Sequence, residues 1–274
     1  MTPPHANSSP DVPLPISVCI ISGTEAHRIG GVLQSTAGWT SETVVVLNED
    51  AHDGTEEIVL RHGGRVHRHA WGGFREQKNL VQTYATQPWV LQLDADEEVS
   101  PELRAEIELF FQVEHERFAG GSFPRKVWFL GRWIKHGDWY PDRVLRLYRR
   151  DAGRWGGSVE HCAVELRGKE KRLCCDLHHF SSPTIADLLR KFPYYSELYL
   201  TRQIETGQRW CAPSVIVRAA WRFARAYVFR RGFLDGYPGF FIAASTAYST
   251  LYRHTRLFEH LHGSPRPCPR SDSR

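Results

Sequence analysis

The chain has 274 residues, of which 41% are hydrophobic and 24% are charged, and its formal net charge is +4. This length and composition allow one large folded region with a real core, and the mildly basic balance fits an anionic partner without requiring one. The six cysteines include no Cys-x-x-Cys pair, which excludes a zinc-binding set and a disulfide framework and makes a reducing cytoplasm the default compartment.

The first half of the chain alternates between apolar runs and amphipathic segments. Residues 1–15 are rich in Pro, Ser and Asn, lack a signal-type tract and are expected to be disordered. Strands are predicted at 16–21, 42–47, 65–68 and 89–93, with helices at 25–37, 56–62 and 74–86. This order predicts a doubly wound parallel sheet. The chain has no Gly-x-Gly-x-x-Gly after the first strand, no P-loop and no Gly-x-Ser-x-Gly elbow, which argues against the enzyme classes that use them.

The second half of the chain changes its pattern. Alternation at period two predicts mixed or antiparallel strands at 121–130, 143–148 and 162–166, and amphipathic helices are expected at 185–205, 214–231 and 239–257. Arginines and aromatic residues mix along 215–231, a composition typical of a helix in a membrane interface. The apolar run at 238–252 is shorter than the ~20 residues that span a bilayer. Packing on the preceding domain and a dimer interface are the alternatives for these helices.

Two carboxylates, Asp94 and Asp96, directly follow the fourth predicted strand. Ligands of parallel α/β domains bind beyond the carboxyl ends of the strands, and residues i and i+2 of an extended chain point the same way. Two neighbouring oxygen ligands suit Mg²⁺ or Mn²⁺, which commonly complete their shell with phosphate oxygens and water. The alternative is an acidic turn before the helix that Ser100 and Pro101 begin.

Several stretches, taken together and in this order, resemble inverting family 2 glycosyltransferases of the GT-A fold, and especially the bacterial lipopolysaccharide core β-glucosyltransferases. They are residues 16–25, 53–55, 71–79, 93–97, 129–134, 139–143, 146–150 and 230–236. The resemblance implies an α/β, Rossmann-like nucleotide-diphospho-sugar transferase domain with a mixed central sheet at 16–183. A helical membrane-associating region would follow at 184–262, and a disordered tail at 263–274.

The resemblance also implies roles for residues at the donor site. Asp94 and Asp96 match the carboxylates that serve the metal and the nucleotide diphosphate, and Asp53 matches the acid of the nucleotide-binding loop. Glu25 stands where the family contacts the base or ribose. The helix segment Gln77-Lys78-Asn79 matches one that lies beside the donor, where Lys78 would suit the diphosphate; the alternative for Lys78 is a solvated helix charge.

Three departures from the family pattern bear on these roles. Asn48 stands where an Asp commonly contacts the uridine, so the donor base is less firmly implied. The first turn reads Gly23-Thr24-Glu25 instead of Lys-Asn-Glu. The Val-His-Glu expected after the core strands is replaced by Val159-Glu160-His161, which puts the roles of the latter two residues in doubt.

Inversion at an anomeric carbon needs one base, which removes the proton of the attacking hydroxyl. By analogy with the family, this base should follow the metal motif by roughly 40 to 70 residues. Asp142 is the first choice because Trp139, Tyr140 and Pro141 would hold it in a rigid aromatic loop; Asp138 and Glu160 are alternatives. A structural ion pair with Arg143 or Arg146 is the competing explanation for Asp142. His179 matches the histidine that completes the metal shell beside Asp96, although a lone histidine is more often structural.

The sequence therefore predicts a metal-dependent transferase that uses Mg²⁺ or Mn²⁺ and moves a hexose to a lipid-linked saccharide. Glucose from UDP-glucose is the commonest case among the look-alikes. The resemblance places the protein in a bacterial cytoplasm, peripheral on the inner face of the membrane, and implies no nucleic acid partner. A non-catalytic GT-A-like module that binds sugar nucleotide or glycolipid is the alternative, and a nucleotide-sugar hydrolase is a weaker one.

Overall fold

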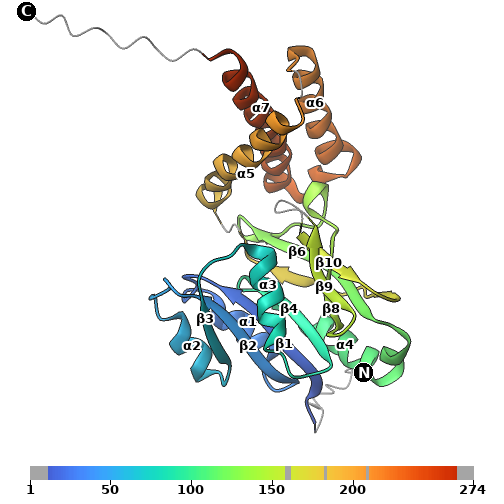
Figure 1. Cartoon of the computed structure of the whole chain (residues 1–274). Coiled ribbons are helices and arrows are strands. Elements are labelled where there is room, and N and C mark those ends of the chain that lie inside the picture. Colours follow the sequence, from blue (N-terminus) through green and yellow to red (C-terminus); the bar gives the residue numbers. More distant parts are fainter. Residues whose placement is uncertain (1–11, 158–161, 182–183, 208–209, 264–274) are drawn as a thin grey trace, which may run out of the picture. The chain divides into compact units, whose positions relative to one another are not determined.

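The computed structural model describes residues 12–157, 162–181, 184–207 and 210–263, and these divide into two compact units (Figure 1). The sheet unit takes the chain up to Trp133 together with Trp139–Ser181. The helical unit takes Ile134–Asp138 and the chain from Ser182 onward. The expectations for Val159, Glu160 and His161, for most of 1–15 and for nearly all of the tail lie outside the described residues.

The sheet unit begins with the predicted strand–helix alternation. Its elements are β1 (Leu14–Ser22), α1 (Ile29–Thr36), β2 (Thr40–Asn48), α2 (Thr55–Arg61), β3 (Arg65–His69), α3 (Phe74–Thr83) and β4 (Trp89–Asp94). The four strands are parallel in the order β3-β2-β1-β4. The predicted helix at 25–37 is shorter than expected, because residues 25–28 form a turn in which the amides of Arg28 and Ile29 both donate to the Glu25 carbonyl.

The rest of the sheet is mixed. The elements are β5 (Glu97–Val99), α4 (Pro101–Val113), a 3₁₀ turn (His115–Arg117), β6 (Gly120–Phe129), β7 (Arg132–Trp133), a second 3₁₀ turn (Gly137–Trp139), β8 (Asp142–Arg149), β9 (Gly153–Gly157), β10 (Cys162–Leu166), β11 (Glu170–Arg172) and β12 (Leu177–His179). The main sheet continues β4-β8-β6-β12-β5, with β8 antiparallel to both neighbours, while β9 and β10 pair separately. The predicted class, an α/β fold with a mixed sheet followed by helices, is confirmed.

Helices cover both faces of the parallel strands. Ile16, Val18 and Ile20 of β1 pack with residues of α1, α2 and α4 in one apolar core, whereas Cys19 and Ile21 pack with Val81 of α3 in another. Successive residues of a strand point to opposite faces. Val90 belongs to the α3 side, so Asp94, four residues further along β4, points toward α3 as well.

The helical unit contains α5 (Ile185–Glu205), α6 (Ala212–Ala224), a π-helical turn (Arg225–Phe229), a 3₁₀ turn (Gly232–Asp235) and α7 (Gly236–His262). In Figure 1, α7 packs against α5 and against α6. None of the described helices combines the length and the apolar character that crossing a membrane requires.

Residues 134–138, which follow β7 in sequence, belong to the helical unit. The carboxylate of Asp235, only 1% exposed, accepts hydrogen bonds from the backbone N–H of Lys135 (3.0 Å) and of His136 (2.8 Å). Its other oxygen lies 3.1 Å from Nδ1 of His136. Asp138 is surrounded by Arg222, Arg225 and Arg230 at 3.5–3.8 Å. Two carboxylates thus anchor this short segment to the helices.

Candidate active site

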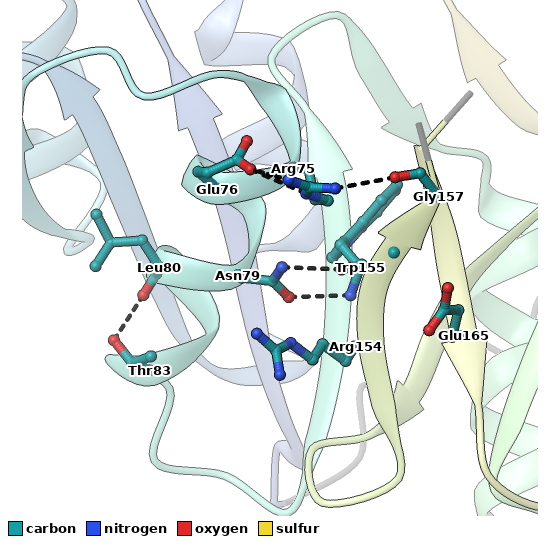
Figure 2. A pocket seen from close by; sticks show the side chains of 10 residues that line it. Arg75, Glu76, Asn79, Leu80, Thr83, Arg154, Trp155, Gly157 and Glu165 are labelled. Carbon is teal, nitrogen blue, oxygen red and sulfur yellow. Dashed lines mark hydrogen bonds and ion pairs between the residues drawn. The ribbon is translucent and has the colours of Figure 1, made fainter. Parts of the chain in front are cut away.

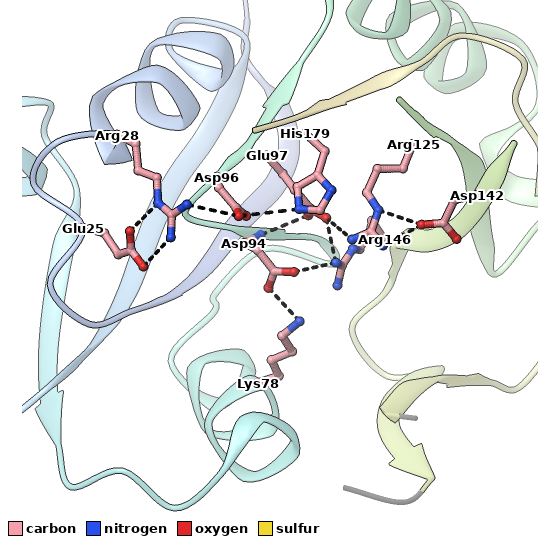
Figure 3. Close-up of polar contacts among 10 residues, drawn as sticks. All are labelled: Glu25, Arg28, Lys78, Asp94, Asp96, Glu97, Arg125, Asp142, Arg146 and His179. Carbon is pink, nitrogen blue, oxygen red and sulfur yellow. Dashed lines mark hydrogen bonds and ion pairs between the residues drawn. The ribbon is translucent and has the colours of Figure 1, made fainter. Parts of the chain in front are cut away.

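The carboxyl end of β4 carries a buried network of charged side chains (Figure 3). Asp94 Oδ1 lies 2.7 Å from Lys78 Nζ, and Asp94 Oδ2 lies 2.7 Å from Arg146 Nη2. Burial alone would raise the pKa of Asp94, but Arg146 and Lys78 outweigh it and hold this pKa well below its usual range. Burial lowers the pKa of Lys78, and Asp94 opposes that shift. Lys78 is therefore a buried partner of Asp94 and not a solvated helix charge.

Arg146, which belongs to this network, lies at an irregularity in the pairing of β8 with β6. The pairing of β8 with β6 shifts by one residue between Gly121 and Ser122, which leaves Arg146 without a partner across the ladder. An extra residue of this kind changes the direction of a side chain and is frequent next to active sites. The Arg146 guanidinium is 4% exposed and also lies 2.8 Å from Glu97.

Glu97 is the fully buried centre of the network. It accepts hydrogen bonds from Arg125 and Arg146, both at 2.8 Å, and from the backbone N–H of Asp94 at 3.1 Å. The sequence reasoning missed both Arg125 and Glu97 as site residues. Glu97 directly follows Asp96 in sequence, but only the folded chain shows that its side chain is buried beside Asp94.

Asp142, the predicted base, lies at the far end of this network. Its Oδ2 accepts from Nε (3.0 Å) and Nη2 (2.6 Å) of Arg125, and its side chain is 42% exposed. The partner is Arg125, and neither Arg143 nor Arg146, which were the expected competitors. The alternative base Asp138 lies in the helical unit among three arginines, an arrangement that suits an anchor better than a base.

Asp96 and His179 lie together on the other side of the network. His179 Nε2 is 3.5 Å from Asp96 Oδ2, and Arg28 Nη1 is 3.4 Å from the same oxygen. Burial alone would raise the pKa of Asp96, but His179 and Arg28 hold it below its ordinary value. Arg28 is also paired with Glu25. β12, which carries His179, pairs with β5 immediately after the Asp96 turn, and this pairing brings the two residues together.

Asp96 and His179 fit a divalent cation as two of its ligands. Neighbouring ligands of a six-coordinate ion with bonds of about 2.1 Å are separated by about 3 Å, close to the observed spacing. His179 Nδ1 is buried without a hydrogen-bond partner in the described chain. The described residues hold no group of three or more His, Cys, Asp or Glu suited to a metal, so substrate oxygens and water would have to supply most of the ligands.

The other predicted donor residues are more dispersed. Asp53 accepts from the Ala26 amide (2.9 Å) and from the hydroxyl of Thr55 (2.6 Å), whose oxygen in turn accepts from the Glu25 amide (3.0 Å). The hydrogen bonds from Thr55 are the main reason that the pKa of Asp53 is lowered. Asp53 therefore fastens the turn after β1 to the start of α2, beside Glu25.

The amide side chains of Asn48 and Gln77 each have an oxygen that makes no hydrogen bond in the described chain. Asn48 ends β2, and its Oδ1 is buried with no hydrogen-bond partner among the described residues. Gln77 is 2% exposed and donates from Nε2 to the Ala70 carbonyl at 2.6 Å. Its Oε1 is likewise buried and unpartnered in the described chain. The free oxygens of these amides are the parts that remain for a ligand.

One pocket of the sheet unit borders the network, and a second shares Trp155 with it. One, of about 390 Å³, is lined by Lys78, Arg125, Arg143, Arg146 and Trp155, among others. Lys78 and Arg146 both lie over the ring of Trp155, at 4.3 and 5.2 Å from its centroid. The other, of about 660 Å³, lies between α3 and the β9–β10 pair (Figure 2), where Asn79 makes two hydrogen bonds to the backbone of Trp155. Trp155 therefore lines both pockets, and Asn79 of α3 holds its backbone in place.

The chain is similar to known proteins in sequence and in fold. The family model for glycosyl transferase family 2 matches residues 17–173. An uncharacterized glycosyltransferase of Rickettsia typhi is 27% identical over 89% of this chain and 87% of its own length. The lipopolysaccharide core biosynthesis glycosyltransferase LpsC of Rhizobium meliloti is 27% identical over 88% of this chain and 93% of its own. The structure of S. aureus TarS 1–349 in complex with UDP-GlcNAc is 16% identical, with coverages of 88% and 83% and a TM-score of 0.47.

Proposed function

The chain belongs to glycosyltransferase family 2, and we propose that it transfers a hexose with inversion from a nucleotide diphosphate to a lipid-linked saccharide of the cell envelope. UDP-glucose is the donor we propose first. The similarity to a protein named for lipopolysaccharide core biosynthesis supports an envelope glycan as the product. The proposed donor residues are Glu25, Asn48, Asp53, Gln77, Lys78, Asp94 and Asp96.

One observation carries the proposal: a single buried network joins the end of β4 to Asp142 through Arg146, Glu97 and Arg125. Charged groups held in fixed positions away from water stabilise developing charge without the cost of reorganising. We propose that Lys78 and Arg146, which both line the pocket of about 390 Å³, bind the diphosphate there, and their ion pairs with Asp94 at 2.7 Å support this by showing that both bind an oxygen anion.

In the proposed reaction, Asp142 accepts the proton of the acceptor hydroxyl as its oxygen attacks the anomeric carbon. The bond to the diphosphate breaks on the opposite face, so the configuration inverts and no covalent intermediate forms. Arg125 orients the Asp142 carboxylate through two hydrogen bonds. Asp96 and His179 would hold an Mg²⁺ or Mn²⁺ ion, which when bound would supply Lewis-acid stabilisation of the charge on the leaving diphosphate.

The test is Asp142→Asn, measured as sugar transfer from UDP-glucose to an extracted lipid-linked acceptor fraction. Loss of a general base lowers turnover by about 10²–10⁴-fold, and binding of UDP, measured by thermal shift, should survive. Asp151→Asn is the matched control, because the Asp151 side chain is 82% exposed and only loosely paired with Arg149 at 3.9 Å. Equal turnover in both variants and the wild type would refute the assignment of the base.

A non-catalytic module that binds sugar nucleotide is the second candidate. The observation in its favour is that Asp142 is engaged by Arg125 and both Asp94 oxygens are engaged by cations. The same assay separates the two candidates: a module binds UDP but transfers no sugar even before mutation. A hydrolase would release free sugar without acceptor.

We also propose that the helical unit contacts the inner face of the cytoplasmic membrane. Ile216, Val217 and Trp221 of α6 are 64%, 66% and 55% exposed, and Arg218 and Arg222 lie among them. Exposed apolar side chains flanked by arginines suit the boundary between lipid headgroups and acyl chains. The alternative occupant of this surface is a second copy of the chain, which would appear as a dimer in solution.

A further inference from the structure

The helical unit contains a pocket of about 260 Å³ that is separate from the candidate active site. All three helices contribute to it. Its lining includes Tyr199 and Gln203 of α5, Ser214 and Arg218 of α6, His254 of α7, and Trp210 just before α6. None of the described residues that line the pocket is acidic.

Within the described residues, no carboxylate is paired with Arg218 or with Arg253, the two arginines at this pocket. Arg218 donates to the hydroxyl of Ser214 at 3.1 Å, which is a neutral partner. Arg253 lies over the ring of Tyr199, 4.9 Å from its centroid, and its Nε is buried without a hydrogen-bond partner in the described chain. Burial is the main reason that the pKa values of Arg253 and His254 are lowered, and repulsion by neighbouring arginines adds to it. An anion in the pocket would offset the repulsion among these positive charges.

Further hydrogen-bond donors belong to residues that line this pocket. Nε1 of Trp210 is buried and has no partner among the described residues. α6 begins at the pocket, and the residue before it, Cys211, makes no side-chain capping hydrogen bond. The unpaired amides and the dipole at a helix N-terminus attract anions. A buried indole N–H, an uncapped helix and Arg218 together form a set of donors suited to phosphate oxygens.

We propose that this pocket binds the phosphate of an anionic lipid headgroup. The choice of a lipid over free phosphate follows from α6, where Val217 and Trp221 are one turn apart, mostly exposed and next to Arg218. Apolar side chains beside a phosphate site would enter the acyl region while the headgroup fills the pocket. The inference deepens the proposed membrane contact and rests on it, but not on the donor chemistry.

The test compares binding of the full chain to phosphatidylcholine vesicles with and without phosphatidylglycerol. A generic surface arginine contributes about 1 kcal/mol near an anionic membrane, or about fivefold in affinity. Arg218→Gln should weaken binding to the anionic vesicles by more than tenfold. Arg190→Gln is the matched control: it removes the same charge from α5, where Arg190 is 77% exposed, and should cost about fivefold or less.

Gln203→Glu provides a second, isosteric variant that places a negative charge in the pocket, and it should also lose more than tenfold. If circular dichroism shows that Arg218→Gln is unfolded, Gln203→Glu replaces it in the comparison with Arg190→Gln. Equal losses in Arg218→Gln and Arg190→Gln would overturn the pocket assignment. A thermal shift with inorganic phosphate but no preference for anionic vesicles would overturn the lipid assignment. No nucleotide is present, so failure here is distinguishable from failure of the transferase proposal, which the Asp142→Asn assay tests.

Discussion

Replacing Glu97 by Gln should destabilise the sheet unit strongly. The carboxylate is fully buried and accepts hydrogen bonds from Arg125, Arg146 and the Asp94 amide. Gln keeps the shape but turns one acceptor oxygen into a donor that faces other donors. Breaking a buried ion pair costs about 3–5 kcal/mol. We expect the lower end, about 3 kcal/mol, because both arginines keep a second carboxylate partner.

The assay is thermal unfolding followed by circular dichroism. For a protein of this size, 1 kcal/mol shifts the Tm by about 2–4 °C, so the expected loss is about 6–12 °C. Glu98→Gln is the neighbouring control: burial raises the pKa of Glu98, with no charged group among the causes, so losing its charge should not lower the Tm. If both variants melt within about 1 °C of each other, the buried network does not stabilise the fold and the reasoning fails.

Further changes test other parts of the molecule. Lys78→Met should weaken UDP binding by about tenfold or more in calorimetry, because it removes a charge-assisted donor. The depressed pKa of Asp94 contributes stability that is complete above its unfolded pKa of about 3.9 and is lost as the pH falls toward its folded pKa, so Asp94→Asn should flatten the decline of the urea midpoint on acidification. Asp235→Asn should cost about 1–3 kcal/mol and speed hydrogen exchange at the amides of 135 and 136. Burial raises the pKa of the Cys19 thiol, so iodoacetamide should label it only after unfolding.

The parallel part of the fold follows from local sequence. The predicted strands at 16–21, 42–47, 65–68 and 89–93 became β1 to β4. The rule that ligands gather at the carboxyl ends of strands drew attention to Asp94 and Asp96, which lie at the end of β4 and just after it. The short strands β5, β7 and β11 were not predicted, because two or three residues carry no periodic signal. β5 and β11 form by pairing with strands that are distant in the sequence, whereas β7 pairs with the end of β6 across a two-residue turn.

The partners within the site were less accessible to sequence reasoning. Arg125 and Arg146 come from antiparallel strands whose order in the sheet no local pattern reveals. The direction of the Arg146 side chain depends on a one-residue shift in the pairing of β8 with β6, which cannot be predicted from the alternation of apolar and polar residues along β8. Asp138 was an alternative for the base, but its neighbours come from residues 222–230, far away along the chain.

Because the segment Ile134–Asp138 belongs to the helical unit, that unit is encoded by two separate stretches of the gene. The chain passes from one unit to the other three times, after residues 133, 138 and 181. A unit appended by a single linker can be gained or lost in one recombination event. Here, deleting everything after residue 181 would remove Asp235, the partner of His136, and the three arginines that surround Asp138. Exchanging the helical unit for another would therefore require two separate stretches of the gene to change together.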